Sequence, residues 1–102
     1  MADVPIPPNP LAPQQLQISI DEQVATGMYC NLALLAHNEG EFTFDFIYVQ
    51  PQQPKATVRA RVITNPAHAK RLAQVLNENI ARFEARFGEI TVPPAPDLGP
   101  RH

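Results

Sequence analysis

The chain has 102 residues, a formal net charge of −2, one cysteine and twelve prolines. This length favours a single domain, and the lone cysteine excludes an internal disulfide framework and any multi-cysteine zinc or iron–sulfur site. No stretch is long and apolar enough to span a membrane, and residues 1–10 lack the basic start and apolar run of a signal peptide. We therefore expect a soluble cytoplasmic protein.

Prolines are concentrated at the two ends of the chain. Nine of the twelve lie in the first 13 or the last 10 residues. Because proline lacks an amide proton and restricts the residue before it, these ends are unsuited to helices and central strands. We expect a flexible leader over 1–14, one domain over 15–91 and a flexible tail over 92–102. An alternative for the leader sequence PIPPNPLAP is a polyproline ligand for an aromatic groove.

Four strands are predicted between these ends: residues 16–20, 28–37, 41–49 and 56–64. Their basis is the alternation of apolar and polar side chains that is typical of half-buried strands. The third strand is the strongest, because four aromatic residues share one face: Phe42, Phe44, Phe46 and Tyr48. A helix does not place four aromatic side chains on one face at a spacing of two.

A three-residue turn over residues 38–40, with its glycine in the left-handed conformation, is expected to join the second and third strands. This turn pairs His37 with Glu41 and sets Leu34 opposite Phe44. A two-residue turn would place apolar residues opposite polar ones and reverse the faces of one strand. We therefore predict the three-residue register.

A long helix is predicted after the fourth strand. Asn65 suits the N-cap and Pro66 the first helical position, and Gly88 is suited to end the helix after Phe87. Apolar residues recur along it at alternating spacings of four and three: Ala69, Ala73, Leu76, Ile80, Phe83 and Phe87. Together these elements predict an α+β fold, in which a four-stranded antiparallel sheet is followed by one long C-terminal helix (ββββα).

One helix is expected to cover the aromatic face of this sheet and to leave the other face open. About 75 residues then form the core, close to the ~70–80 residues at which a lone core is marginal. We therefore expect a homodimer, with these residues of the open face as its candidate interface: Tyr29, Asn31, Leu35, Asp45, Ile47 and Ile63. The alternative is a ligand-binding row in which Tyr29 and Asn31 act with Asp45, Arg59 and Arg61.

Charge is segregated along the chain. Residues 1–54 hold six acidic residues and no lysine or arginine, whereas residues 55–86 hold seven basic residues and two glutamates, a net charge of +5. Such a split suits cross-strand pairing, such as Asp45 with Arg61, subunit complementarity, or a surface for nucleic acid. The candidate nucleic-acid contacts are Arg59, Arg61, Lys70, Arg71, Arg82 and Arg86.

No catalytic constellation is evident. Cys30 is predicted on the aromatic face of the sheet, where a thiol behaves as a small hydrophobe rather than as a nucleophile. The histidines and the cysteine match no metal-binding spacing, and the four glycines are isolated, so they form no phosphate-binding loop. We predict no catalytic residue, no cofactor and no metal, and we expect a protein that is not an enzyme.

Three motifs in order resemble a family of short bacterial and archaeal proteins, the domain of unknown function 3467. They are G-x-Y-x-N from Gly27, E-F-x-x-D-F from Glu41 and R-V-x-x-x-P-x-H-A-K from Arg61. The resemblance covers nearly all of residues 18–90. It implies no activity and no site residues, because the family has none assigned.

Two functions follow from these observations. The first is a non-catalytic, homo-oligomeric module for protein interaction or assembly. The alternative is a sequence-tolerant protein that binds single-stranded nucleic acid through the basic fourth strand and helix, as small dimeric proteins with four strands and one helix do. A fold analogy alone does not establish that function.

Overall fold

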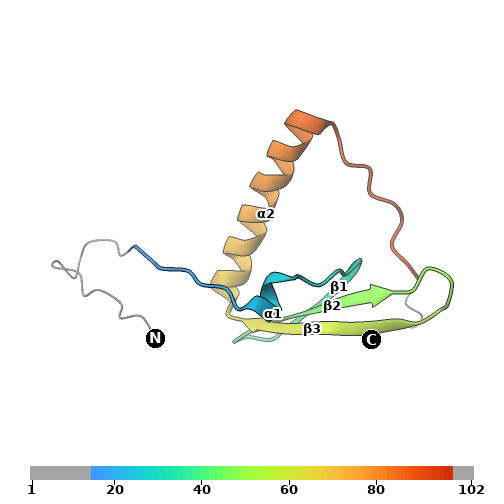
Figure 1. The fold of residues 1–102 in the computed structure, drawn as a ribbon, viewed down its shortest axis with the longest axis horizontal. Helices are drawn as coiled ribbons and strands as arrows, with labels where there is room; N and C mark the ends of the chain where they lie inside the picture. The colour runs from blue at the N-terminus through green and yellow to red at the C-terminus, as the bar shows by residue number, and fades with distance from the viewer. Residues whose placement is uncertain (1–14, 98–102) are drawn as a thin grey trace.

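The computed structural model describes residues 15–97, which form an α+β fold with three antiparallel strands and a long C-terminal helix (Figure 1). The elements in chain order are α1 (Glu22–Ala25), β1 (Leu32–His37), β2 (Phe42–Val49), β3 (Ala56–Thr64) and α2 (Pro66–Phe87). The strands lie in the order β1-β2-β3, so β2 is central. The predicted α+β class is confirmed. The prolines of residues 1–14 and 98–102 lie outside the described residues.

The first of the four predicted strands, residues 16–20, is absent from this sheet. The segment has no regular secondary structure, and its three apolar side chains, Leu16, Ile18 and Ile20, are 77%, 90% and 67% exposed. Alternation gives a segment the side-chain pattern of a strand, but a strand also needs a hydrogen-bonded neighbour, and no backbone hydrogen bond joins these residues to the rest of the described chain. Instead, the chain turns at Asp21, whose carbonyl accepts from the amides of Val24 and Ala25 and opens α1.

The register of β1 against β2 differs from the prediction by one residue. His37 pairs with Phe42 and Leu35 with Phe44, so Leu34 lies opposite Asp45. The cause is Asn38, whose side-chain oxygen accepts from the amides of residues 40 and 41 at 2.8 and 3.0 Å and closes a tighter turn. The predicted left-handed glycine is wrong as well, because Gly40 does not have a positive φ.

This shift exchanges the faces of β1. Residues that pair directly across two strands share a face, so Ala33 and Leu35 join the aromatic side chains of β2, and Leu34 lies on the opposite face. We had placed Leu35 on the open face and Leu34 on the aromatic one, and both assignments are wrong. A shift of one residue has this effect because side chains alternate along a strand.

The pairing of β2 with β3 follows the prediction as far as Phe46. Asp45 pairs with Arg61, as expected. An irregularity follows: Phe46 pairs with Ala60, but the next residue, Ile47, pairs with Val58 rather than with Arg59. Strand β3 accommodates Arg59 at this point as one extra residue, a β-bulge.

Helix α2 has the bounds that its caps predict. The side-chain oxygen of Asn65 accepts from the amide of His68 at 2.8 Å, and Pro66 occupies the first turn. At the other end Gly88 has φ +104°, a region that favours glycine, and its amide donates to the carbonyl of Glu84 at 2.9 Å. The Glu84 carboxylate accepts from the amide of Ile90 at 2.9 Å, which fixes the chain beyond the helix.

We had expected the helix to cover the aromatic face, and this prediction is wrong. Helix α2 rises instead from one end of the sheet (Figure 1). Only one residue, Asn65, separates β3 from α2, and Pro66 restricts the backbone at this junction, so the direction of the helix is set where it begins. Among residues 15–97, the buried apolar residues are Phe44, Ile47 and Ala69. The Cα radius of gyration is 18.3 Å, against about 13 Å for a compact domain of 100 residues. The described residues of a single chain thus bury very little of their apolar surface.

No helix of the described residues has the length and apolar character needed to cross a membrane.

Candidate functional site

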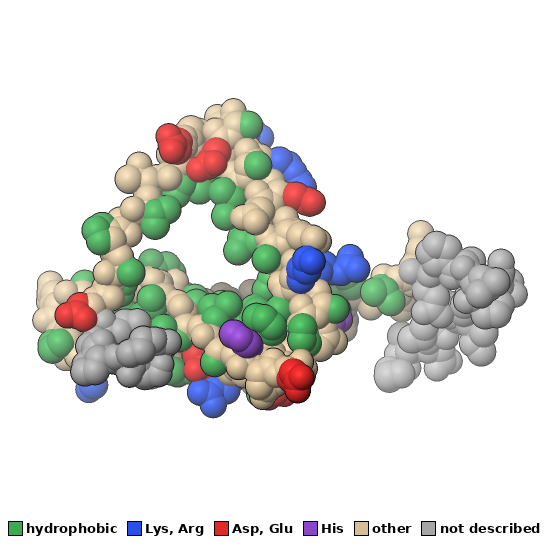
Figure 2. All heavy atoms as spheres, turned by 180° about the vertical axis from the view of Figure 1, so that it is seen from behind, with side chains coloured by type: hydrophobic (Ala, Val, Ile, Leu, Met, Phe, Trp, Pro, Cys, Tyr) green, Lys and Arg blue, Asp and Glu red, His purple; other side chains and the backbone are tan. Residues whose placement is uncertain are grey.

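An apolar trough of about 710 Å³ lies between the aromatic face of the sheet and the first turns of α2. From the sheet it is lined by Leu35, Phe42, Phe44 and Phe46, and from the helix by Pro66, Ala69, Lys70, Leu72, Ala73 and Leu76. Lys70 is the one charged residue in this lining. Figure 2 shows hydrophobic side chains around an opening that is bounded by the sheet, α2 and the chain beyond α2.

The floor of the apolar trough is built by the period of β2. Spacing by two places Phe42, Phe44 and Phe46 on one face, and the rings of Phe44 and Phe46 meet edge to face with their centroids 6.2 Å apart. The ring of His37 stacks on Phe42 at 5.3 Å, at the turn end of the trough. Leu35 completes the floor from β1, and it is 62% exposed.

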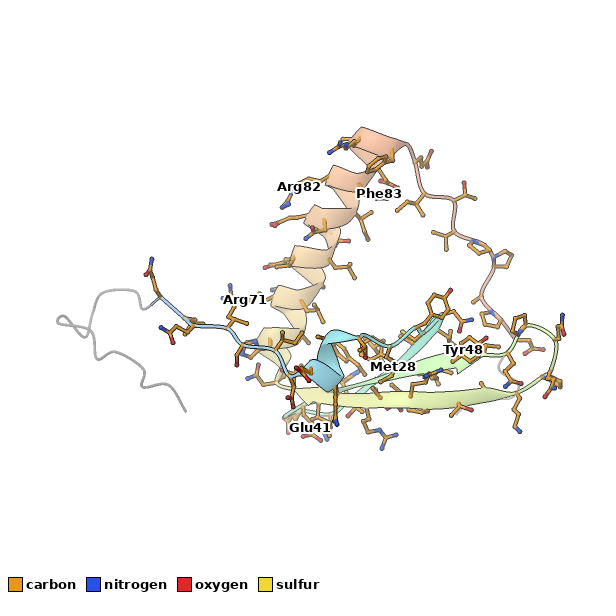
Figure 3. All side chains as sticks on the ribbon, in the orientation of Figure 1. Met28, Glu41, Tyr48, Arg71, Arg82 and Phe83 are labelled. Carbon is orange, nitrogen blue, oxygen red and sulfur yellow. The ribbon has the colours of Figure 1, made fainter. Side chains whose placement is uncertain are left out.

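The wall of the apolar trough continues along α2 as a stripe of exposed apolar side chains. We call this the helix stripe; its members are Leu72, Leu76, Ile80, Phe83 and Phe87. Figure 3 shows Phe83 on the side of α2 that faces the opening, and Arg71 and Arg82 on the opposite side. The rings of Phe83 and Phe87 lie 5.0 Å apart, so the stripe is continuous to the end of the helix.

On the opposite face of the sheet, Asp45 and Arg61 form a bidentate ion pair. Nε of Arg61 donates to one Asp45 oxygen at 2.7 Å, and a terminal guanidinium nitrogen donates to the other at 2.9 Å. These hydrogen bonds hold the pKa of Asp45 below its ordinary value and raise that of Arg61. The pair thus joins β2 to β3 and leaves neither charge available as an isolated acid or base.

The comparisons with known proteins give one result. Residues 3–92 match the family model described as a protein of unknown function (DUF3467). The chain belongs to this family. No curated protein and no solved structure matches it. The family match begins well before α1, so it includes the extended residues 16–20 as well as the sheet and α2.

The motifs that indicated this DUF3467 membership have structural roles in the fold. Asn31, from G-x-Y-x-N, donates its side-chain amide to the carbonyl of Val49 at 3.1 Å and accepts from the Val49 amide at 2.8 Å. This side chain therefore takes the place of a backbone partner at the end of β2. The motif E-F-x-x-D-F supplies Asp45 of the ion pair. The motif R-V-x-x-x-P-x-H-A-K supplies Arg61 of the pair and Ala69, a buried residue of α2.

The six residues predicted as the interface do not share one surface. Ile47 is 4% exposed and belongs to the core, whereas Ile63 is 56% exposed. Leu35 lies on the aromatic face because of the register. Tyr29 is exposed, and its ring meets that of Tyr48 edge to face at 6.2 Å. The sequence identified the aromatic face of β2 and the apolar positions of α2, but the open trough was missed because α2 was predicted to cover that face. The register misplaced only Leu35 among the lining residues.

The six candidate nucleic-acid contacts lie in several separate places. Arg61 is engaged by Asp45, and Arg59 lies over the ring of Tyr48 at 5.7 Å. On α2, Arg82 is 4.0 Å from Glu78, one turn away. Lys70 and Arg71 lie in the first turns of the helix, and Arg86 lies over the ring of Phe87 near its end. The fold therefore does not gather these side chains into one basic groove.

Cys30 is half-buried, just before β1. Within residues 15–97, no three histidine, cysteine or acidic side chains converge in a way that could hold a metal ion. The side chains that line the apolar trough are suited to apolar contact.

Proposed function

We propose that this DUF3467 protein is a non-catalytic assembly module that forms a homodimer, with α2 of each copy lying in the apolar trough of the other. The observation that carries the proposal is the apolar trough itself, together with the helix stripe beside it. Both are apolar and neither is covered within the described chain. Exposed apolar patches of this kind are typical of protein interfaces.

Burial gives the physical reason for a partner. Removing a large apolar side chain from water contributes about 1.5–3 kcal/mol, and a folded domain needs many such contributions to offset its conformational entropy. Among the described residues, only Phe44, Ile47 and Ala69 expose less than a tenth of their surface to solvent. Covering the helix stripe would supply the missing burial.

A second copy of this chain is the partner that the surface fits best. The apolar trough and the helix stripe belong to the same molecule and are both apolar. In a two-fold dimer, the helix stripe of each copy would therefore cover the apolar trough of the other. The 22 residues of α2 extend about 33 Å at 1.5 Å per residue. That length exceeds the roughly 27 Å of an eight-residue strand such as β2. The helix can therefore cross the whole floor of a partner's trough.

The test is sedimentation velocity of the full chain at micromolar concentrations, with two matched variants. Leu76→Glu places a charge in the helix stripe, and Arg71→Glu places the same side chain on the outer side of α2 (Figure 3). We expect the wild type and Arg71→Glu to sediment as dimers and Leu76→Glu to dissociate. Because Leu76 is exposed in a single chain, its replacement leaves the isolated fold little changed. A monomeric wild type, or a Leu76→Glu variant that dimerises like the wild type, would contradict the proposal.

A further inference from the structure

We infer that residues 16–20 of one copy add to the sheet of a second copy as a fourth strand, hydrogen-bonded to the free edge of its β1. This inference rests on the proposed homodimer and specifies a second contact within it. The apolar trough explains how two copies cover α2, but it leaves the exposed segment before α1 without a place.

The segment has the properties of a strand that lacks its sheet. Leu16, Ile18 and Ile20 are spaced by two and are at least two-thirds exposed. No backbone hydrogen bond ties the segment to the described chain. Figure 1 shows this segment passing the base of α2, with its N-terminal end extending outward beyond the three strands. The match to the family model includes the segment, which makes it part of the family's common unit.

The outer edge of β1 is the better of the two available edges. The sheet order leaves one edge of β1 and one of β3 without a neighbouring strand among the described residues. Strand β3 contains a bulge and two arginines, features that protect an edge from further pairing. Strand β1, with the sequence LALLAH, contains neither lysine, arginine nor proline, and its register against β2 is regular throughout.

The added strand would also complete the apolar trough. Ala33 and Leu35 of β1 lie on the aromatic face, and Leu35 is 62% exposed at the border of the trough. A neighbouring strand that directs its three apolar side chains to the same face would cover Leu35 and widen the floor that receives the partner's helix. Its polar residues, Gln17 and Ser19, would then lie on the other face.

The experiment is disulfide cross-linking between two different full-length chains, each with Cys30→Ala. One chain carries Ile18→Cys, and the other carries a size tag and, in separate samples, Ala33→Cys, Leu35→Cys or His37→Cys. Three positions are used because they share a face, and the pairing register follows from whichever one reacts. Directly opposed residues in antiparallel strands have Cβ atoms about 4.5–5.5 Å apart, within reach of a strained or relaxed disulfide. The chains are unfolded together, refolded and oxidised.

We expect a covalent heterodimer with one of the three positions and loss of that product when Gln17→Cys replaces Ile18→Cys. Failure at all three positions, while the unoxidised chains still sediment as dimers, overturns the strand exchange and leaves the homodimer standing. A monomer-sized disulfide in the double variant Ile18→Cys/Leu35→Cys shows pairing within one chain and also overturns it. A Leu35→Cys chain that cross-links only to itself shows that two β1 edges pair with each other. Unoxidised chains that sediment as monomers contradict the homodimer itself.

Discussion

Strand β2 and helix α2 carry the two strongest apolar patterns of the chain, yet they have very different surroundings. β2 has a hydrogen-bonded strand on each side, and two of its residues, Phe44 and Ile47, are buried. α2 has a pattern of comparable strength, but it leaves the sheet at its first turns and buries only Ala69. The same kind of sequence signal thus produces a core in one element and an exposed surface in the other.

The difference comes from how each element obtains its neighbours. A hairpin brings β1 and β3 beside β2 through short connections, so β2 is enclosed by residues close to it in sequence. A helix that follows the last strand has no such neighbour, and its apolar side must be covered by another layer. The exposed stripe on α2 therefore indicates where a second layer belongs.

The contrast between β2 and α2 can be tested by replacing one isoleucine with alanine in each element, and the variant in β2 should have the largest effect on stability. Ile47→Ala in β2 removes a side chain that is 4% exposed and should lower the free energy of unfolding by about 2–5 kcal/mol. Chemical denaturation measures this loss, and it should be the same at low and high protein concentration. A loss below about 1 kcal/mol would show that Ile47 is not part of the core.

Ile80→Ala in α2 is the matched variant. Ile80 is 36% exposed in a single chain, so its truncation should cost little in samples dilute enough to dissociate the proposed dimer. In concentrated samples the loss should grow, because the proposed dimer would bury this side chain and dimerisation links stability to concentration. Thermal unfolding over a hundredfold range of concentration measures the difference. A loss that is independent of concentration would mean that α2 packs only within its own chain.

The start of α2 should show a smaller effect. Asn65→Ala removes the oxygen that accepts from the His68 amide and should cost about 0.5–2 kcal/mol. Asn79→Ala is the control, since Asn79 lies inside the helix and donates only to the carbonyl of Val75, and alanine is the better helix former there. Equal losses for the two variants in urea denaturation would argue against the cap.

The smallest expected effect is electrostatic. Arg61 lowers the pKa of Asp45 in the folded state below its ordinary value of 3.8. The pair therefore stabilises the fold fully when the pH is above 3.8, and this contribution is lost as the pH falls through the lowered pKa. Asp45→Asn should therefore be less stable than the wild type at pH 7, and the gap should close in acid. Glu39→Gln, which removes an equal charge at the turn, serves as the control. Thermal melts between pH 7 and pH 2 measure both; a gap that stays constant would contradict the assignment.

Much of the fold could be predicted from local signals. Asn65, Pro66 and Gly88 bound α2 because caps act over one turn of chain, and the alternating aromatics of β2 identify the central strand. The ion pair between Asp45 and Arg61 was predicted as well, because the bulge falls just beyond it. These features depend on residues that are close in sequence or directly paired.

The candidate site could not be predicted in the same way. Its position depended on the turn at Asn38, where the side chain closes a tighter loop and moves Leu35 to the aromatic face. It also depended on the direction in which α2 leaves the sheet, because a helix that lay along the aromatic face would fill the trough (Figure 1). Apolar periodicity records neither the side-chain hydrogen bonds of Asn38 nor the direction of α2.

The sequence by itself determined the class of the fold, the bounds of the long helix and the aromatic face of β2, because propensity, capping and periodicity act locally. Only the tertiary structure decided that residues 16–20 lie outside the sheet and that α2 rises away from it. The physical reason is that a strand needs a partner and a helix stripe needs a covering layer. Whether either is present depends on the direction in which the chain leaves each element.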